Sequence, residues 1–212
     1  MDKNYTHITM VLDRSGSMHN LVQDTIGGFN KFIQDQKNLP DKATMTLIQF
    51  DHEYRVDYNG IPMENVKELD SSSYTPRGNT ALLDALNKAI LETKTYIDGI
   101  AENNRPGRVV VVVVTDGGEN SSKEIKKDDL KKLVTECESN LWRFVFMGAN
   151  IDAFSEASSL GMLSCGATLQ YEPTKHGLSS SYESLSRGMR GIRGMDYGSA
   201  VSCSTSFFEK ND

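Results

Sequence analysis

Short apolar runs alternate with amphipathic stretches along most of the chain. Residues 7–12 form an apolar run that ends at Asp13, which is typical of a buried strand. Apolar side chains then recur at helical spacing over residues 21–33, and Pro40 follows as a helix-ending signal. The pattern predicts a strand followed by an amphipathic helix.

A hairpin and a second helix come next. Residues 44–50 and 54–58 each alternate apolar and polar positions, and the polar segment 51–53 separates them. This pattern is typical of two antiparallel strands joined by a turn, so we expect one edge of the sheet to be antiparallel. After a loop rich in Ser and Asp, residues 82–97 again show the helical spacing of apolar side chains.

Six consecutive valines occupy positions 109–114, and this run has no polar face. A strand of this kind must be covered on both sides, which is typical of a parallel sheet with helices on each face. The run ends at the polar segment 115–120. We therefore expect this strand at the centre of the sheet.

The rest of the chain continues the alternation of strand and helix. The expected elements are a charged helix at 126–139, a strand at 142–148, a short helix at 152–160, a weaker strand at 167–171 and a last helix at 179–190. This order predicts an α/β fold that is doubly wound, with a mostly parallel central sheet, one antiparallel edge strand and helices on both faces.

The chain is expected to form one domain, residues 1–195, followed by a C-terminal tail, residues 196–212. This end of the chain is rich in Gly and Ser. We expect the tail to be partly ordered at best, with docking of Phe207 and Phe208 onto the domain as the alternative.

Composition and charge narrow the range of partners. The 212 residues are 38% hydrophobic and 25% charged, which is enough apolar material for a packed core. The net charge of -6 disfavours a nucleic-acid partner, since phosphate binding needs a concentrated Lys/Arg face. The one basic cluster, in 123–132, is interleaved with acidic residues and is typical of a solvated helix face.

The sequence also predicts a cytoplasmic protein without a membrane partner. The first residues lack the charged-then-apolar layout of a secretory signal, and no apolar run is long enough to cross a bilayer. Cys137, Cys165 and Cys203 are widely spaced and odd in number, which fits reduced thiols better than a disulfide framework.

Oxygen-bearing side chains gather in three loops at the ends of strands or the starts of helices. The first loop offers Asp13, Ser15 and Ser17, the second offers Thr80, and the third offers Asp116. In an open parallel sheet such loops meet along one edge, where ligands bind. Mg²⁺ prefers oxygen ligands and commonly keeps some waters, so the five residues predict a magnesium site, with Mn²⁺ or Ca²⁺ as alternatives.

These loops resemble the von Willebrand factor A domain family over roughly residues 5–190. The segment Asp13-Arg14-Ser15-Gly16-Ser17 is similar to its Asp-x-Ser-x-Ser element, Thr80-Ala81-Leu82-Leu83 is similar to its threonine loop, and Thr115-Asp116-Gly117 is similar to its distal aspartate. Together these elements form the metal-ion-dependent adhesion site of that family. One departure is Gly78-Asn79-Thr80, where a second glycine often precedes the threonine.

The resemblance also implies the role of each residue. Ser15 and Ser17 would bind the metal directly, while Asp13 would bind it through water or orient the other ligands. Thr80 and Asp116 would exchange direct and water-mediated contacts as the site opens and closes. The sixth ligand would be an Asp or Glu carboxylate from a partner protein. Chains of this kind without a signal resemble an intracellular bacterial or phage branch of the family, whose members often work inside larger assemblies.

Simpler interpretations remain for each residue alone. Ser17 and Thr80 are common helix caps, and Asp116 before two glycines is a common turn residue. Residues near the three loops, among them Arg14, Arg77, Glu119 and Asn120, are candidates for the rim of the site or for plain solvated surface.

Three functions follow from these loops. The first is a binding module that does no chemistry. The second is a Mg²⁺-dependent phosphoryl-transfer enzyme with Asp13 as nucleophile, although Ser15 stands where such phosphatases usually have a second acid. The third is a scaffold whose metal only stabilises the fold.

Overall fold

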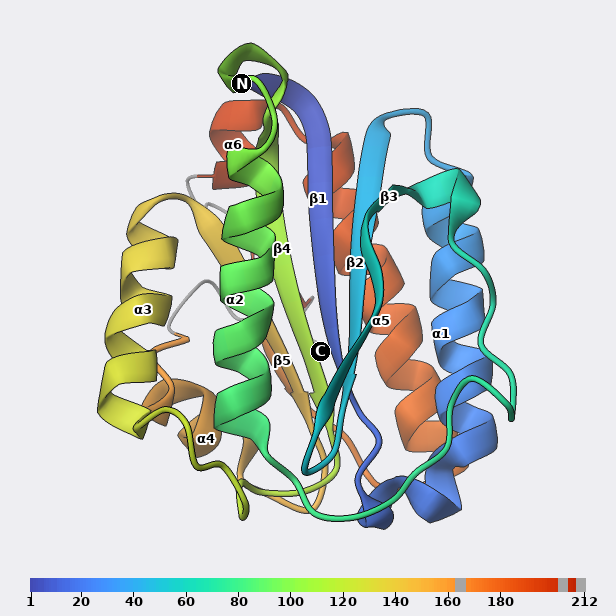
Figure 1. Ribbon diagram of the computed structural model, residues 1–212. Coiled ribbons are helices and arrows are strands. Elements are labelled where there is room, and N and C mark those ends of the chain that lie inside the picture. The colour runs from blue at the N-terminus through green and yellow to red at the C-terminus, as the bar shows by residue number, and fades with distance from the viewer. Residues whose placement is uncertain (163–166, 202–205, 209–212) are drawn as a thin grey trace.

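The computed structural model describes residues 1–162, 167–201 and 206–208. One six-stranded sheet forms the centre of the molecule, and five of its strands are parallel (Figure 1). The one antiparallel strand is β3, which pairs with β2 at one edge. In sheet order the strands are β3 (Tyr54–Pro62), β2 (Lys42–Phe50), β1 (Asp2–Asp13), β4 (Pro106–Thr115), β5 (Trp142–Gly148) and β6 (Thr168–Gln170).

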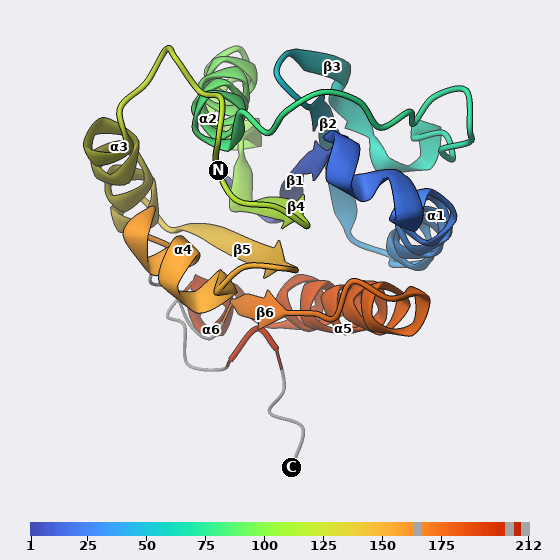
Figure 2. The same cartoon turned by 90° about the horizontal axis from the view of Figure 1, so that it is seen from below.

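Helices cover both faces of this sheet, as Figure 2 shows from below. One face carries α1 (Val22–Lys37) and α5 (Lys175–Gly194), and the other carries α2 (Leu82–Asp98), α3 (Lys127–Ser139) and α4 (Ala153–Ser159). The predicted fold class is confirmed, including the hairpin and its antiparallel edge strand.

The valine strand lies where its sequence predicts. β4 is hydrogen-bonded to β1 on one side and to β5 on the other. Val110, Val112 and Val114 enter the core under α1 and α5, while Val111 and Val113 enter the core under α2 and α3. Since alternate side chains of a strand point to opposite faces, the absence of a polar face follows from burial on both sides.

The described part of the C-terminal end holds the end of one helix, a second short helix and a pair of phenylalanine rings. The last long helix extends to Gly194, and a short helix α6 (Tyr197–Val201) follows it. Phe207 and Phe208 are buried in the core under α5, so the rings dock onto the domain. Cys165 and Cys203 lie outside the described residues, and Cys137 is a buried free thiol.

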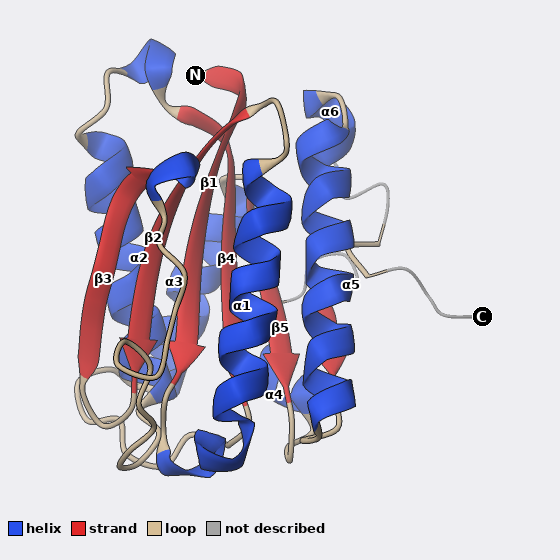
Figure 3. Ribbon diagram, turned by 90° about the vertical axis from the view of Figure 1, so that its right-hand side faces the viewer, coloured by secondary structure: helices blue, strands red, loops and turns tan. Residues whose placement is uncertain are grey.

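The parallel strands end together at the lower end of the molecule in Figure 1, and Figure 3 shows their arrowheads reaching the same edge. α6 lies at the opposite, upper end. Among the described helices, none is long and apolar enough to cross a membrane.

Candidate metal centre

The structure brings the five predicted ligands to the carboxyl edge of the sheet. Asp13 is the last residue of β1, and Asp116 directly follows β4, its neighbour in the sheet. Ser15 and Ser17 lie where the chain turns from β1 into a short 3₁₀ helix (Gly16–Leu21). Thr80 lies two residues before α2.

Ser17 links the first loop to the third. Its hydroxyl donates a hydrogen bond of 2.5 Å to Oδ1 of Asp116, and its Oγ lies 3.0 Å from Oγ of Ser15. Ser17 is exposed, whereas Ser15 and Asp116 are buried. Three predicted oxygen ligands from two loops therefore lie close together, and the Ser17 side chain connects them to solvent.

Asp13 lies deeper and is fully buried. Its Oδ1 accepts a hydrogen bond from the backbone N–H of Ser15 (2.6 Å), and its Oδ2 accepts one from the Thr115 hydroxyl (2.6 Å). Burial raises the pKa of Asp13 to about 6, although these hydrogen bonds act in the opposite direction. Burial raises the pKa of Asp116 as well. Two acids at this edge thus lack a compensating cation among the described side chains.

Gly117 leaves space beside the two remaining hydroxyls. A Cβ at this position would lie 3.4 Å from Oγ of Ser17 and 3.7 Å from Oγ1 of Thr80. Both oxygens therefore face the same small volume, which the glycine keeps open. Oγ1 of Thr80 makes no hydrogen bond to any part of the chain that the structure describes, so its lone pairs are free for a ligand.

The helix-cap interpretation fails for Ser17 and Thr80. α1 begins only at Val22, with Leu21 at its N-cap position, and α2 has Ala81 at its N-cap position. Neither cap position makes a side-chain hydrogen bond. Helix capping therefore does not explain why these two hydroxyls lie at this edge of the sheet.

Backbone hydrogen bonds fix the threonine loop against the serine loop. The N–H of Gly16 donates to the carbonyl of Gly78 (3.0 Å), and the N–H of Arg77 donates to the carbonyl of Arg14 (2.7 Å). Gly78 has a φ of +66°, a conformation that favours glycine, so this glycine suits the turn before Thr80.

Asn120 and Glu119 hold the same loop from the other side. Oδ1 of Asn120 accepts from the N–H of Thr80 (2.9 Å), and the N–H of Asn120 donates to the carbonyl of Thr80 (3.0 Å). Oε2 of Glu119 accepts from the N–H of Leu83 (2.8 Å) at the start of α2. The sequence marked both residues only as rim candidates, and the structure gives them a positioning role.

Asp51 also helps to fix the loops around the predicted site, although the sequence pattern placed it only in a hairpin turn. It follows β2, is fully buried, and its Oδ2 lies 3.1 Å from Nε of Arg14 and 2.8 Å from Nε of Arg77. Its carbonyl accepts from the N–H of Ala81 (2.8 Å), next to Thr80. Its position directly after a strand, at the same edge as Asp13, is the signal that could have identified it.

Asp51, His52 and Glu53 also lie within metal-binding distance of one another, as the one such group of His, Cys, Asp and Glu side chains among the described residues. The two guanidinium groups on Asp51 already neutralise that carboxylate. This group is therefore an ion-pair cluster beside the predicted site and does not include its ligands.

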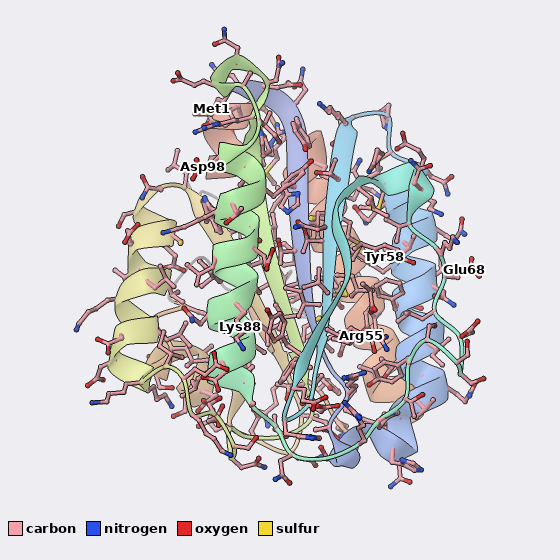
Figure 4. The ribbon with its side chains drawn as sticks, in the orientation of Figure 1. Met1, Arg55, Tyr58, Glu68, Lys88 and Asp98 are labelled. Atoms are coloured by element: carbon pink, nitrogen blue, oxygen red, sulfur yellow. The ribbon has the colours of Figure 1, made fainter. Side chains whose placement is uncertain are left out.

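A groove of about 380 Å³ runs beside the threonine loop between β3 and α2. Lys88 of α2, labelled in Figure 4, points toward β3, and its Nζ lies 4.3 Å from the ring centre of Tyr54. The same Nζ lies 2.8 Å from Oε1 of Glu124. The groove therefore provides one cation and several acids next to the predicted ligands, and it is open to a partner.

His7 takes no part in the predicted site. His7 is fully buried in β1, with its ring 2.9 Å from Oγ1 of Thr44 and within hydrogen-bonding distance of Thr9. Burial lowers its pKa to about 3, so this ring is neutral at ordinary pH. His7 therefore has a local hydrogen-bonding role within the sheet.

Known proteins resemble this chain at the level of family and fold. The family model of the von Willebrand factor type A domain matches residues 7–176. No curated protein sequence matches the chain. Solved structures match with a probability of 1.00, although at identities that establish the fold alone.

One similar structure is proximal thread matrix protein 1 from the mussel byssus, with its MIDAS motif (the metal-ion-dependent adhesion site) occupied by zinc (TM-score 0.60, 17% identity, 86% of this chain and 45% of that chain). Another is a von Willebrand factor type A protein from Catenulispora acidiphila (0.58, 16%, 88% and 42%). A third is the vWF domain of the type V pili tip protein Mfa5 from Porphyromonas gingivalis (0.61, 10%, 90% and 96%). The chain spans less than half the length of the first two.

Proposed function

The chain belongs to the von Willebrand factor type A domain family, and from this premise we propose that it is a metal-dependent protein-binding module. The observation that carries the proposal is the convergence of oxygen ligands from three loops at one strand edge. Ser15 and Ser17 would hold a divalent cation directly, and Asp13 would hold it through water or by orienting the other ligands. Thr80 and Asp116 would exchange direct and water-mediated contacts with it as the site opens and closes.

The donor set fits a hard divalent cation. Three hydroxyls and two carboxylates are oxygen ligands of the kind that Mg²⁺ prefers, and the two carboxylates neutralise its charge. Mg²⁺ is the proposed ion, with Mn²⁺ or Ca²⁺ as alternatives. The zinc-occupied motif of the mussel protein supports a divalent cation at this position. When bound, the cation supplies a coordination position for an anionic oxygen, for which we propose an Asp or Glu carboxylate of a partner protein.

The proposal includes no catalysis. The competing phosphoryl-transfer mechanism needs Asp13 as an accessible nucleophile. Asp13 is fully buried, and each of its oxygens already accepts a hydrogen bond. This placement supports an orienting role for the carboxylate.

We propose a cytoplasmic setting, with no nucleic-acid or membrane partner and with a place in a larger assembly. The net charge of -6 supports the exclusion of nucleic acid. The buried free thiol of Cys137 is compatible with a reducing compartment.

The first experiment measures metal binding by calorimetry on the chelator-stripped protein. We expect saturable Mg²⁺ and Mn²⁺ binding that is lost in Asp13→Ala and weakened about 10–100-fold in Thr80→Ala. Gly117→Ala places a methyl group against Ser17 and Thr80 and is expected to weaken binding without unfolding the protein. Thr95→Ala, at an exposed position of α2, is the matched control. Absence of binding to the wild-type protein would contradict the proposal.

The second experiment separates a binding module from a scaffold stabilised by metal. Mn²⁺ bound at the site relaxes its exchangeable water, and acetate serves as a probe for the partner carboxylate. We expect acetate to lower the water relaxation in a saturable manner, and Thr80→Ala to weaken this response. Metal binding without any acetate response would leave only the scaffold role.

A further inference from the structure

Two buried arginines lie at the end of the sheet opposite the predicted metal site. Arg108 is 3% exposed near the start of β4, and Arg143 is 5% exposed near the start of β5. Val110 is paired in register with Arg143, and Arg108 precedes Val110 by two residues. Because paired and alternate strand residues share a face, both guanidinium groups project to the α5 side, which Val110 also joins.

Neither guanidinium group has a carboxylate partner among the described residues. Nη2 of Arg108 donates to the carbonyl of Met195 (2.7 Å), and Nη2 of Arg143 donates to the carbonyl of Ala200. The buried Nε and Nη1 of Arg108 and the buried Nε of Arg143 have no hydrogen-bond partner in the part of the chain that the structure describes. Burial lowers the pKa of Arg143, as expected for a cation removed from water.

Arg193 shows how a buried arginine is normally accommodated in this protein. It is 4% exposed, and its Nε donates to Oδ2 of Asp41 at 2.8 Å, while Nη1 donates to two oxygens of Gln36. Arg193 and Arg143 are equally buried, yet only the first is neutralised. Isolated buried charges are strongly unfavourable, so the unpaired arginines indicate a missing anion.

A cavity of about 370 Å³ lies beside Arg143, between the start of β5, α5 and the docked Phe207. Arg143 and Arg187 line it, together with the hydroxyl of Ser184, and Nη2 of Arg187 donates to this hydroxyl oxygen (3.0 Å). Ile192 and Phe207 form an apolar part of its wall. A second space of about 10 Å³, large enough for one water, lies between Arg108 and Arg143.

We propose that this cavity binds a small organic phosphate ester, with its phosphate group on Arg143 and Arg187 and its organic part against Phe207. A phosphate dianion matches the two positive charges that line the cavity, and its oxygens can accept from N–H groups of both guanidinium groups. A carboxylate would neutralise only one of them. The described lining contains no acidic residue that would repel the ligand.

The test uses inorganic phosphate and phenyl phosphate on the full chain, in the presence of chelator so that no metal can bind either probe. We expect a saturable rise in melting temperature of about 5 °C with phosphate that chloride at equal ionic strength does not give. Phenyl phosphate is expected to bind about tenfold more tightly than phosphate because its ring packs on the apolar wall.

Substitutions locate the site. Arg187→Gln is expected to weaken phosphate binding at least tenfold, and Arg143→Met to abolish it. Arg190→Gln is the matched control, since Arg190 is exposed on the same helix and does not line the cavity. Arg187 is also exposed, so its variant keeps the test valid even if Arg143→Met fails to fold. No phosphate effect beyond that of chloride, equal loss in Arg190→Gln, or equally tight binding of acetate would each overturn the proposal.

Discussion

The two ends of the sheet bury arginines in opposite ways. At the carboxyl end, Arg14 and Arg77 share the fully buried carboxylate of Asp51. At the amino end, Arg108 and Arg143 have carbonyl oxygens as hydrogen-bond partners and no carboxylate partner within the described part of the chain. The arginines of the first end thus share an anion from the chain itself, whereas Arg143 at the second end lines a cavity that can admit one. A buried arginine that lacks an anion from the chain therefore stands out beside one that has such an anion, and it points to a ligand.

Removal of the shared carboxylate at the carboxyl end of the sheet should have the largest effect on stability. Asp51→Asn leaves Arg14 buried without an anion, and we expect the free energy of unfolding to fall by about 3–5 kcal/mol, the usual cost of breaking a buried ion pair. Denaturant unfolding measures this loss. An unchanged midpoint would show that the buried arginines at the two ends are equally tolerated without an anion, and the comparison would fail.

A third way to bury a titratable group is to lose its charge, as His7 does. The unfolded chain takes up a proton on this ring below its ordinary pKa of 6.5, whereas the folded ring does so only near pH 3. The unfolded state thus binds more protons between these values, so stability falls as pH falls through this window. From pH 6.5 to pH 5 we expect a loss of about 2 kcal/mol.

Denaturant unfolding of the wild-type protein and of His7→Gln at pH 7 and pH 5 measures this contribution. The difference between the two proteins isolates His7 from other groups that titrate, including Asp13. The variant should lack this part of the pH dependence. The same dependence in both proteins would contradict a neutral buried ring.

At the amino end of the sheet, removal of an arginine should increase stability. Arg143→Met replaces a buried unpaired cation by an apolar side chain of similar length, so in phosphate-free buffer we expect the protein to gain about 1 kcal/mol. Thermal unfolding measures this gain, and Arg193→Met, which leaves Asp41 without its partner, serves as the destabilising counterpart. A loss of similar size in both variants would mean that Arg143 is already neutralised.

We expect the smallest effect on stability from an exposed ion pair at the carboxyl end of the sheet. Nη2 of Arg77 lies 2.6 Å from Oε2 of Glu53, and both side chains are more than half exposed. Exposed ion pairs contribute little, so Glu53→Gln should shift the melting temperature by less than about 1 °C. A larger shift would show that Asp51 needs this exposed neighbour to hold Arg77.

Local patterns predicted most of the fold because they depend on neighbours in the chain. The six valines at 109–114 and the alternation at 44–50 reflect burial of particular faces, which the sequence displays directly. The five predicted ligands were also readable, since each follows a strand or precedes a helix, and the structure brings them to one edge of the sheet.

The remaining features depend on distant parts of the chain. Arg108 meets the carbonyl of Met195 87 residues later, and Arg143 meets that of Ala200 57 residues later. These partners lie at the end of α5 and in α6, and no spacing in the sequence encodes the contacts. The roles of Asp51 and Asn120 likewise arise from loops that meet only in the folded sheet.

The pairing of β1 with β4 also sets the order in which this protein can assemble. β1 finds its partner β2 about 40 residues along the chain, but the register that joins Thr6 to Arg108 spans 102 residues. During synthesis from the amino end, one edge of β1 stays open until β4 has emerged, and closing such a long loop slows folding. The hydrogen bond from Thr115 to Asp13 spans the same distance. The predicted ligands therefore assemble only when β4 pairs with β1, and metal capture would report that step.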